Sequence, residues 1–139
     1  MVSAGSVGVS VYDQNVAAGR YLGKWKNYRN SNSHFYRGTV KHSSSRGASF
    51  TYRFKGKQIF LISNLARDRG KAAVFIDGKC KGRIDAYAPN RRYRQVVYKY
   101  PKKPHSSDQI HTIRIKILRR KRAVSKGYRF GIDGLGVLR

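Results

Sequence analysis

The segment Ala48-Ser-Phe-Thr-Tyr-Arg-Phe54 alternates apolar and polar side chains from end to end. In an extended chain, successive side chains point to opposite faces, so the four apolar members of this segment share one face. The segment Thr112-Ile-Arg-Ile-Lys-Ile117 repeats the pattern with three isoleucines on one face. Such alternation is typical of an antiparallel strand that packs one face on a core and turns the other to solvent. No stretch of the chain sustains the apolar spacing of a helix, which predicts an all-β protein.

Working outward from these two segments, weaker alternation predicts further strands. They are Val7–Tyr12, Tyr21–Lys26, Phe35–His42, Gln58–Ser63, Ala72–Ile76, Gly82–Tyr87, Gln95–Tyr100 and Tyr128–Val137. About nine short strands separated by turns predict an antiparallel two-sheet β-sandwich, or jelly roll. Asp77-Gly78 is a dipeptide favoured in tight hairpins, because both central residues need a positive φ.

The predicted core collects the inward-facing members of the strongest strands. It comprises Phe50, Tyr52, Phe54, Val74, Ile76, Ile113, Ile115, Ile117, Phe130 and Ile132. A length of 139 residues suits one domain. We expect residues 1–10 to form an N-terminal extension or edge strand and residues 11–139 to form the sandwich.

The charge balance of the chain is strongly one-sided. It contains 31 Lys and Arg against six acidic residues, all of them Asp, for a formal net charge of +25. Glycoside hydrolysis usually needs two carboxyl groups a few ångströms apart, and here few carboxylates are present. No glycine-flanked serine indicates a nucleophile elbow. The composition therefore predicts that the protein is not an enzyme.

The sequence offers little for a metal or a cofactor. A single cysteine, Cys80, excludes an intramolecular disulfide framework, and the four His residues lack zinc-site spacing. Asp13, Asp85 and Asp133 could supply oxygens to a structural Ca²⁺, but no local calcium loop is present and the positive net charge opposes a cation. His111 is most simply a hydrogen-bonded edge residue. We expect no cofactor and no metal.

The first ten residues lack the basic and continuous apolar regions of a signal peptide, and no later stretch approaches a membrane span. We expect an extracellular, cell-surface or virion location. An export signal would then lie outside this chain, or export would follow another route.

Several motifs resemble a known group of domains. They are Tyr12-Asp13, Trp25, Thr39–Ser43, Gly47–Gly56, Gly70–Gly78, Asp85-Ala-Tyr87, His111–Ile115, Ser125 and Ile132–Leu135. Across Val11–Leu138 the chain resembles the carbohydrate-binding-module-like jelly rolls appended to secreted bacterial hydrolases and surface proteins. The resemblance implies a non-catalytic domain beside a catalytic or anchoring one. The chain departs from the pattern in its loops, which carry Arg and Lys where the resembled domains have Ser, Thr, Gly and Asn.

The order of the strands also sorts the loops. Each strand of an antiparallel sandwich crosses the domain, so successive connections alternate between its two ends. One end, the Arg end, should carry Ser43–Gly47, Leu65–Gly70, Ala88–Arg92 and Arg119–Gly127. The opposite end, the Lys end, should carry Lys55–Lys57, Gly78–Lys81 and Pro101–Gln109, which contain no Arg. Guanidinium groups bind carboxylate, sulfate and phosphate through two hydrogen bonds, whereas Lys acts as a hydrated point charge.

The Arg end is therefore the candidate ligand site. Its expected residues are Arg46, Arg67, Arg69, Arg91, Arg92, Tyr93, Arg119, Arg120 and Arg122. Tyr residues 87, 93, 98 and 100 alternate with Arg and Lys, which fits stacking on a polyanion or simply a Tyr-rich strand with a solvated basic face. Trp25 could stack on a sugar or pack at the edge of the core.

Three hypotheses of function follow. The first is a non-catalytic binding module for an anionic polymer, an acidic extracellular or cell-envelope polysaccharide. The second is sequence-independent nucleic-acid binding through phosphate contacts, since no recognition motif is present. The third is a structural subunit of a surface layer, filament or virion. A fused domain or an assembly partner fits the first and third hypotheses, and the charge could also serve solubility alone.

Overall fold

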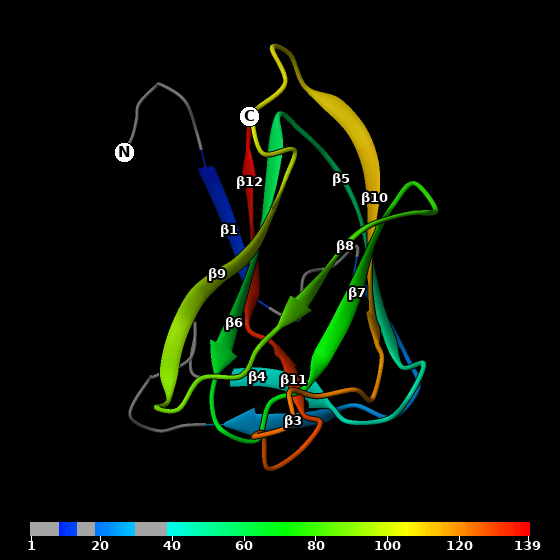
Figure 1. Ribbon diagram of the computed structural model, residues 1–139. Coiled ribbons are helices and arrows are strands. Elements are labelled where there is room, and N and C mark those ends of the chain that lie inside the picture. Colours follow the sequence, from blue (N-terminus) through cyan, green and yellow to red (C-terminus); the bar gives the residue numbers. More distant parts are fainter. Residues whose placement is uncertain (1–8, 14–18, 30–38) are drawn as a thin grey trace.

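A computed structural model describes residues 9–13, 19–29 and 39–139, and every regular element within them is a strand (Figure 1). Accordingly, these residues contain no helix long and apolar enough to cross a membrane. The strands are β1 (Val9–Asp13), β2 (Gly19–Leu22), β3 (Lys26–Arg29), β4 (Thr39–Ser43), β5 (Ser49–Gly56), β6 (Gln58–Leu65), β7 (Lys71–Ile76), β8 (Lys79–Asp85), β9 (Arg92–Tyr100), β10 (Gln109–Ile117), β11 (Phe130–Ile132) and β12 (Gly134–Leu138).

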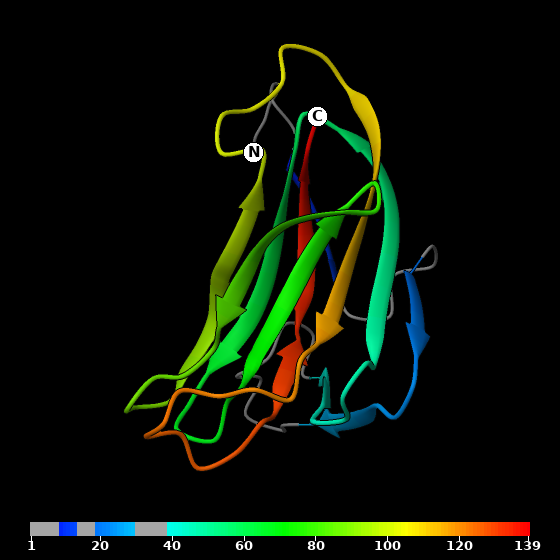
Figure 2. The same ribbon diagram turned by 45° about the vertical axis from the view of Figure 1, so that its right-hand side comes forward.

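The strands form two main sheets and one small sheet. The first sheet has the order β1-β12-β6-β9, and the second has the order β2-β5-β10-β7-β8. The two pack face to face as a sandwich, and the small sheet β11-β4-β3 closes its lower end (Figures 1 and 2). All pairings between named strands are antiparallel. The predicted fold class is confirmed, with twelve described strands where about nine were expected.

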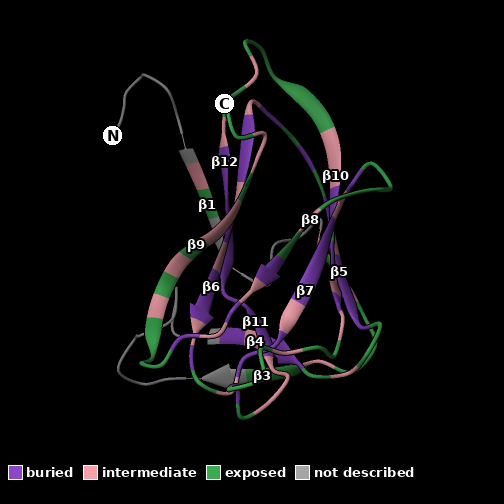
Figure 3. Ribbon diagram, viewed as in Figure 1, coloured by how far each residue is buried: buried purple, intermediate pink, exposed green. Residues whose placement is uncertain are grey.

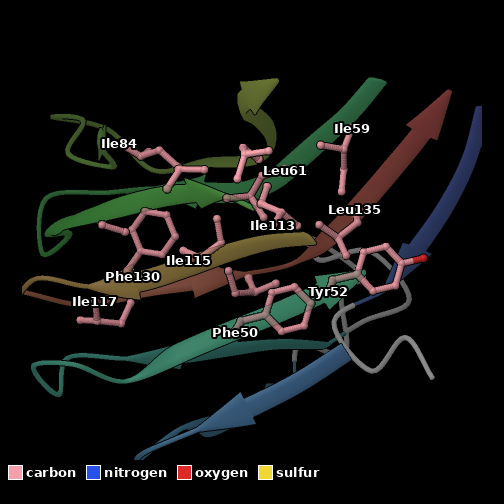
Figure 4. Close-up of a cluster of buried hydrophobic side chains, with 14 of the residues drawn as sticks. Phe50, Tyr52, Ile59, Leu61, Ile84, Ile113, Ile115, Ile117, Phe130 and Leu135 are labelled. Atoms are coloured by element: carbon pink, nitrogen blue, oxygen red, sulfur yellow. The ribbon is translucent and has the colours of Figure 1, made fainter. Parts of the chain in front are cut away.

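The core lies between the two main sheets. All ten predicted core residues belong to the buried cluster, which also takes in residues such as Ile59, Leu61 and Leu135 (Figure 4). The buried segments run along the middle strands, while β9 and the loops are more exposed (Figure 3). Each fully buried Ile, Leu or Phe side chain stabilises the fold by about 1.5–3 kcal/mol relative to exposure. The alternation in β5 and β10 therefore supplies much of the driving force for the sandwich.

One predicted strand is interrupted. Tyr21–Lys26 divides into β2 and β3 because Gly23 adopts a φ of +90°, and a Cβ on it would lie 2.9 Å from the Cα of Ala48. After this break, the indole N–H of Trp25 donates to the Leu22 carbonyl at 2.9 Å. The indole also meets the ring of Tyr21 edge to face at a centroid distance of 5.0 Å. Of the two interpretations of Trp25, these contacts favour edge packing.

The predicted C-terminal strand Tyr128–Val137 also divides in two. Residues in β11 pair with β4 in the small sheet, whereas residues in β12 pair with β6 and β1 in the first sheet. Asp133, at the junction, is buried, and its N–H donates to the Ile62 carbonyl at 2.9 Å. At the N-terminus, β1 runs across residue 10, where we expected an extension to end and the sandwich to begin. That domain boundary stays a prediction. The predicted strands Val7–Tyr12 and Phe35–His42 lie partly outside the described residues.

The Asp77-Gly78 hairpin is confirmed, with φ values of 52° and 84°. The Asp77 carboxylate accepts a hydrogen bond from the Thr112 N–H at 2.8 Å and lies 2.6 Å from Nδ1 of His111. The hydrogen bond with His111 is the main reason why the pKa of Asp77 lies below its usual value. His111 is thus hydrogen-bonded, as expected, but it was wrongly expected at a sheet edge, because its strand β10 lies between β5 and β7.

Candidate anion-binding site

The connections assigned to the Arg end do gather at one end of the sandwich, the lower end in Figure 2. The Lys126 N–H donates to the Arg67 carbonyl at 2.7 Å, and the Ala88 N–H donates to the Ala66 carbonyl at 3.0 Å. The guanidinium of Arg119 donates to the Ser44 carbonyl at 3.0 Å. Backbone and side-chain hydrogen bonds therefore join all four connections, and the predicted sorting of the loops is confirmed for this end.

Two small residues allow these connections to approach closely. The buried Oγ of Ser125 lies 2.7–3.0 Å from the carbonyl oxygens of Arg67, Arg69 and Gly127, and its single proton serves one of them at a time. A Cβ on Gly70 would lie 2.6 Å from the Tyr128 carbonyl oxygen, so the position needs glycine. Both residues fix the loop before β7 against the loop before β11. The backbone that carries the cationic side chains of these loops is thereby held in a defined position.

A groove of about 470 Å³ opens between the joined loops. It is lined by Ala66, Arg67, Asp68, Pro89, Asn90, Arg91 and Lys126. Its three cationic side chains are exposed. Its one acid, Asp68, forms ion pairs with Arg69 and, at 3.5 Å, with Arg129. Because that carboxylate is already paired with two guanidinium groups, the groove presents a net positive lining with an amide beside it.

Two aromatic rings support guanidinium groups of the Arg-end connection between β10 and β11. Arg122 lies 5.1 Å from the centre of the Tyr87 ring, and its Nε donates to Asp85 at 3.1 Å. Arg119 lies 4.6 Å from the centre of the Tyr128 ring. Contacts of this kind contribute about 0.5–1 kcal/mol at exposed sites. They restrict both guanidinium planes at the surface.

A second, smaller pocket adjoins the groove through Arg91, which lines both. Its volume is about 40 Å³, and its lining comprises Val40, His42, Asn64, Arg69, Arg91, Arg129 and Gly131. Burial, with further contributions from Arg129, Arg69 and Lys26, lowers the pKa of His42 to about 4. Burial also lowers the pKa of Arg69. The neighbourhood of this pocket therefore disfavours additional positive charge.

The structure treats the nine expected site residues differently. Arg67 and Arg91 line the groove, and Arg119 and Arg122, outside its lining, stack on tyrosine rings. Arg92 and Arg120 are exposed, and Tyr93 is half-buried in β9. Two residues depart from the expected exposed cluster: Arg69 is only 7% exposed, and Arg46 lines a separate depression of about 450 Å³ with Lys24 and Arg114. Arg69 is buried where it pairs with Asp68, and Arg46 belongs to the loop on the β2 side.

Sequence reasoning missed Asn64, His42 and Arg129, which the small pocket brings together. The signal for Asn64 was the polar pair Ser63-Asn64 at the end of an apolar run. No local signal marks the other two, because their proximity depends on the pairing of β4 with β11.

Two of the tyrosines fit the interpretation of a Tyr-rich strand, while stacking on a polyanion stays a prediction. Tyr98 and Tyr100 pack against the core, and the Tyr98 hydroxyl donates to the Lys81 carbonyl at 2.9 Å. Burial raises the pKa of Tyr98. Tyr87 instead supports Arg122 at the surface. In the described part of the chain, no group of three or more His, Cys, Asp or Glu residues could hold a metal ion.

In its fold, the chain is a β-sandwich like that of a carbohydrate-binding module. No family model matches the chain. The curated A type blood N-acetyl-alpha-D-galactosamine deacetylase of Flavonifractor plautii is 32% identical over 69 residues, which are 50% of this chain and 9% of that protein. The chain thus corresponds to a small part of this relative.

Solved structures show the same architecture at low sequence identity. The xanthan lyase of Paenibacillus has a TM-score of 0.65 at 13% identity, covering 91% of this chain and 13% of the lyase. A two-domain esterase active on acetylated mannans has a TM-score of 0.64 at 13% identity, covering 94% of this chain and 36% of the esterase. The CBM36-1 domain of a multidomain xylanase from the hindgut metagenome of Trinervitermes trinervoides has a TM-score of 0.54 at 13% identity, covering 94% of this chain and 96% of that domain. These likenesses show the fold alone.

Proposed function

We propose that this chain is a non-catalytic module that binds an acidic polysaccharide through the groove at the Arg end. The observation that carries the proposal is the groove itself, in which Arg67, Arg91 and Lys126 meet from three separate connections. Relatives of this fold include domains of enzymes named for xanthan, mannans and xylan-type substrates, which favours a carbohydrate over other polyanions. An extracellular location fits such a ligand.

The groove residues offer different kinds of contact to a polysaccharide. Arg67 and Arg91 supply forked donors for carboxylate, sulfate or phosphate groups, and Lys126 adds a mobile point charge. Asn90 offers both a donor and an acceptor for sugar hydroxyls. The stacked guanidinium groups of Arg119 and Arg122 extend the positive surface beyond the groove. A chain with charges along its length would therefore make several contacts at once.

The first experiment measures binding of the full chain to a polyuronate, a sulfated polysaccharide, a neutral mannan, duplex DNA and single-stranded DNA at matched ionic strength. We expect the acidic polysaccharides to bind and the neutral mannan to bind poorly. The logarithm of the association constant should fall linearly with the logarithm of salt concentration. Tighter binding of either DNA at every salt concentration would replace this proposal with sequence-independent nucleic-acid binding. Concentration-dependent assembly without polymer binding, by light scattering, would favour a structural subunit.

A matched pair of variants locates the binding surface. Replacing Arg91 and Arg92 with Lys keeps the charge but removes the forks, so affinity should fall several-fold while most of the salt slope remains. Neutralising Lys55, Lys57, Lys102 and Lys103 at the Lys end should change affinity less than the Arg-to-Lys pair. If the Lys changes abolish binding and the Arg changes do not, the groove is not the site.

The non-catalytic part of the proposal has its own test. Prolonged incubation with the bound polysaccharide should release no reducing ends, acids or acetyl groups, because the groove's carboxylate, Asp68, is held by two guanidinium groups. Turnover that disappeared in a folded Asp85→Asn or Asp133→Asn variant would contradict it.

A further inference from the structure

The small pocket beside the groove contains buried donors that no described residue satisfies. Asn64 is 1% exposed, and its Nδ2 has no hydrogen-bond partner among the described residues. The same holds for Nε of Arg69, which is 7% exposed. A buried donor without a partner costs about 1–3 kcal/mol, so two of them beside one pocket require a physical reason.

The orientation of the Asn64 amide is set by its neighbour. The Arg94 N–H donates to Oδ1 of Asn64 at 3.3 Å, which leaves the NH₂ group as the atom without a partner. This contact arises at a bulge: Ser63 pairs with Gln95 and Leu65 with Arg92, so β9 has one extra residue between them. Arg94 accordingly adopts a φ of 53°. The bulge therefore places the Arg94 N–H against Oδ1 of Asn64, and the NH₂ group is the end of the side chain without a partner.

Arg69 is held in a similar way. Its Nη1 pairs with Asp68, while its Nε faces no acceptor among the described residues. The pocket wall adds the guanidinium groups of Arg91 and Arg129. Its volume of about 40 Å³ admits a small group and excludes a sugar ring.

We infer that this pocket binds a single small anionic group, a carboxylate or an anion of similar size, through Nδ2 of Asn64 and Nε of Arg69. An amide NH₂ and a guanidinium N–H donate only, so both require an acceptor, and the positive charge of the guanidinium favours an anionic one. Charge-assisted hydrogen bonds of this kind are stronger than neutral ones.

The electrostatic surroundings support an anion. His42 lines the same pocket, and the charged groups that act on it are Arg129, Arg69 and Lys26, which lower its pKa, and Asp68, which raises it. Three cations against one anion leave a positive potential. A negative charge placed in the pocket would offset that potential and make His42 easier to protonate.

The inference rests on the proposed function for the source of the anion, because Arg91 connects the pocket to the groove. The bound group would then be the carboxylate of one residue of the acidic polysaccharide. The same chemistry would take up a free small carboxylate. The experiment therefore tests the free anion and the polymer separately.

The free anion is tested by NMR on the full chain. Nitrate is a suitable probe because it is planar like a carboxylate and stays ionised at every pH used, and free glucuronate is the second probe at pH 7. A bulky sulfonate salt keeps ionic strength constant. We expect saturable shifts of the Asn64 side-chain amide and the Arg69 Nε–H, and a rise of about one unit in the pKa of His42 at saturating nitrate. Absence of these shifts would overturn the inference.

Two isosteric variants provide the control. Asn64→Asp keeps the acceptor for the Arg94 N–H but replaces the donors with an anion, so nitrate affinity should fall roughly tenfold or more. Asn90→Asp makes the same charge change in the groove, outside the pocket, and should leave nitrate affinity within about twofold. Asn64→Ala removes the donors without adding charge and serves if Asn64→Asp fails to fold. Equal effects of Asn64→Asp and Asn90→Asp would overturn the inference.

The polymer separates this inference from the proposed function. If nitrate binds as expected but no acidic polysaccharide binds, the pocket stands and the proposed function fails. If polysaccharide binds with the expected effects of Arg91→Lys and Arg92→Lys while nitrate moves no pocket signal, the proposed function stands and the pocket fails. If both stand, polysaccharide should compete with nitrate for the pocket signals in the wild-type chain.

Discussion

The two ends of the sandwich carry charge of the same sign but differ in how their polar groups are satisfied. At the Lys end, the buried Gln58 amide donates to the Pro101 carbonyl at 2.7 Å, and His111 pairs with Asp77. At the Arg end, Asn64 and Arg69 keep buried donor atoms that no described residue accepts. The sign of the charge therefore does not distinguish the two ends. What distinguishes them is the pair of buried donor atoms at the Arg end that have no acceptor among the described residues.

The largest expected effect at the Arg end is a dependence of protein stability on pH. The pKa of His42 is about 4 in the folded protein against an ordinary value of 6.5, so the unfolded chain binds a proton that the folded chain excludes. The free energy of unfolding should therefore fall as pH drops from 6.5 to 4, by up to roughly 3 kcal/mol. Urea unfolding across this range measures it. The dependence of the free energy of unfolding on pH should flatten in His42→Gln. An unchanged dependence in this variant would mean that His42, at the Arg end, does not cause the loss of stability.

One tightly packed glycine at each end allows the two ends of the sandwich to be compared by substitution. A Cβ on Gly70 would lie 2.6 Å from the Tyr128 carbonyl oxygen, and a Cβ on Gly56, at the Lys end, would lie 2.7 Å from the Leu138 carbonyl oxygen. Overpacking of this kind costs about 1–3 kcal/mol, so both Gly→Ala variants should lower the free energy of unfolding. Only Gly70→Ala should also weaken polysaccharide binding by the folded protein, because it displaces the groove loops. Equal loss of binding in both variants would break the distinction between the ends.

A milder test concerns the hydroxyl that joins the Arg-end loops. Ser125→Ala removes the buried contact to the Arg67 and Arg69 carbonyls and should cost about 1 kcal/mol of stability, with weaker polysaccharide binding. Ser107, exposed in the Lys-end loop, provides the matched control. Thermal unfolding and a binding isotherm measure both quantities. The two alanine variants should differ, and identical behaviour would mean that Ser125 does not organise the groove.

The smallest effect is expected at the Lys end. Asp77→Asn retains an acceptor for the Thr112 N–H but replaces the carboxylate hydrogen-bonded to His111 with a neutral amide, and the side chain is 51% exposed. Exposed pairs contribute about 0.2–1 kcal/mol. Because the pKa of Asp77 is lowered, this contribution is present above pH 3.8 and is lost as pH falls below it. Unfolding at pH 6 should show the small difference, and polysaccharide affinity should not change.

The sequence was informative where structure follows local pattern. The alternation in Ala48–Phe54 and Thr112–Ile117 predicted buried faces that the structure confirms, and Asp77-Gly78 predicted its hairpin. Strand boundaries failed where a single backbone position decided them. At Gly23, one positive φ divides a predicted strand, and at Asp133 the chain leaves one sheet for another. Neither event changes the hydrophobic pattern, so the pattern could not reveal them.

The candidate site, too, was predicted in part by the sequence and decided in part by the tertiary structure. The sequence by itself determined the fold class, the core faces and the gathering of the Arg-rich connections at one end, because side-chain alternation and strand parity are properties of the chain order. Only the tertiary structure decided that Arg69 is buried beside Asp68, that Arg46 lines a separate depression, and that Asn64 and Arg129 share a pocket. Those outcomes depend on the bulge between β6 and β9 and on the pairing of β4 with β11, which join residues far apart in sequence. The physical reason is that a pocket is defined by the relative positions of separate strands, and these are fixed by packing and register over the whole sandwich rather than by any local run of residues.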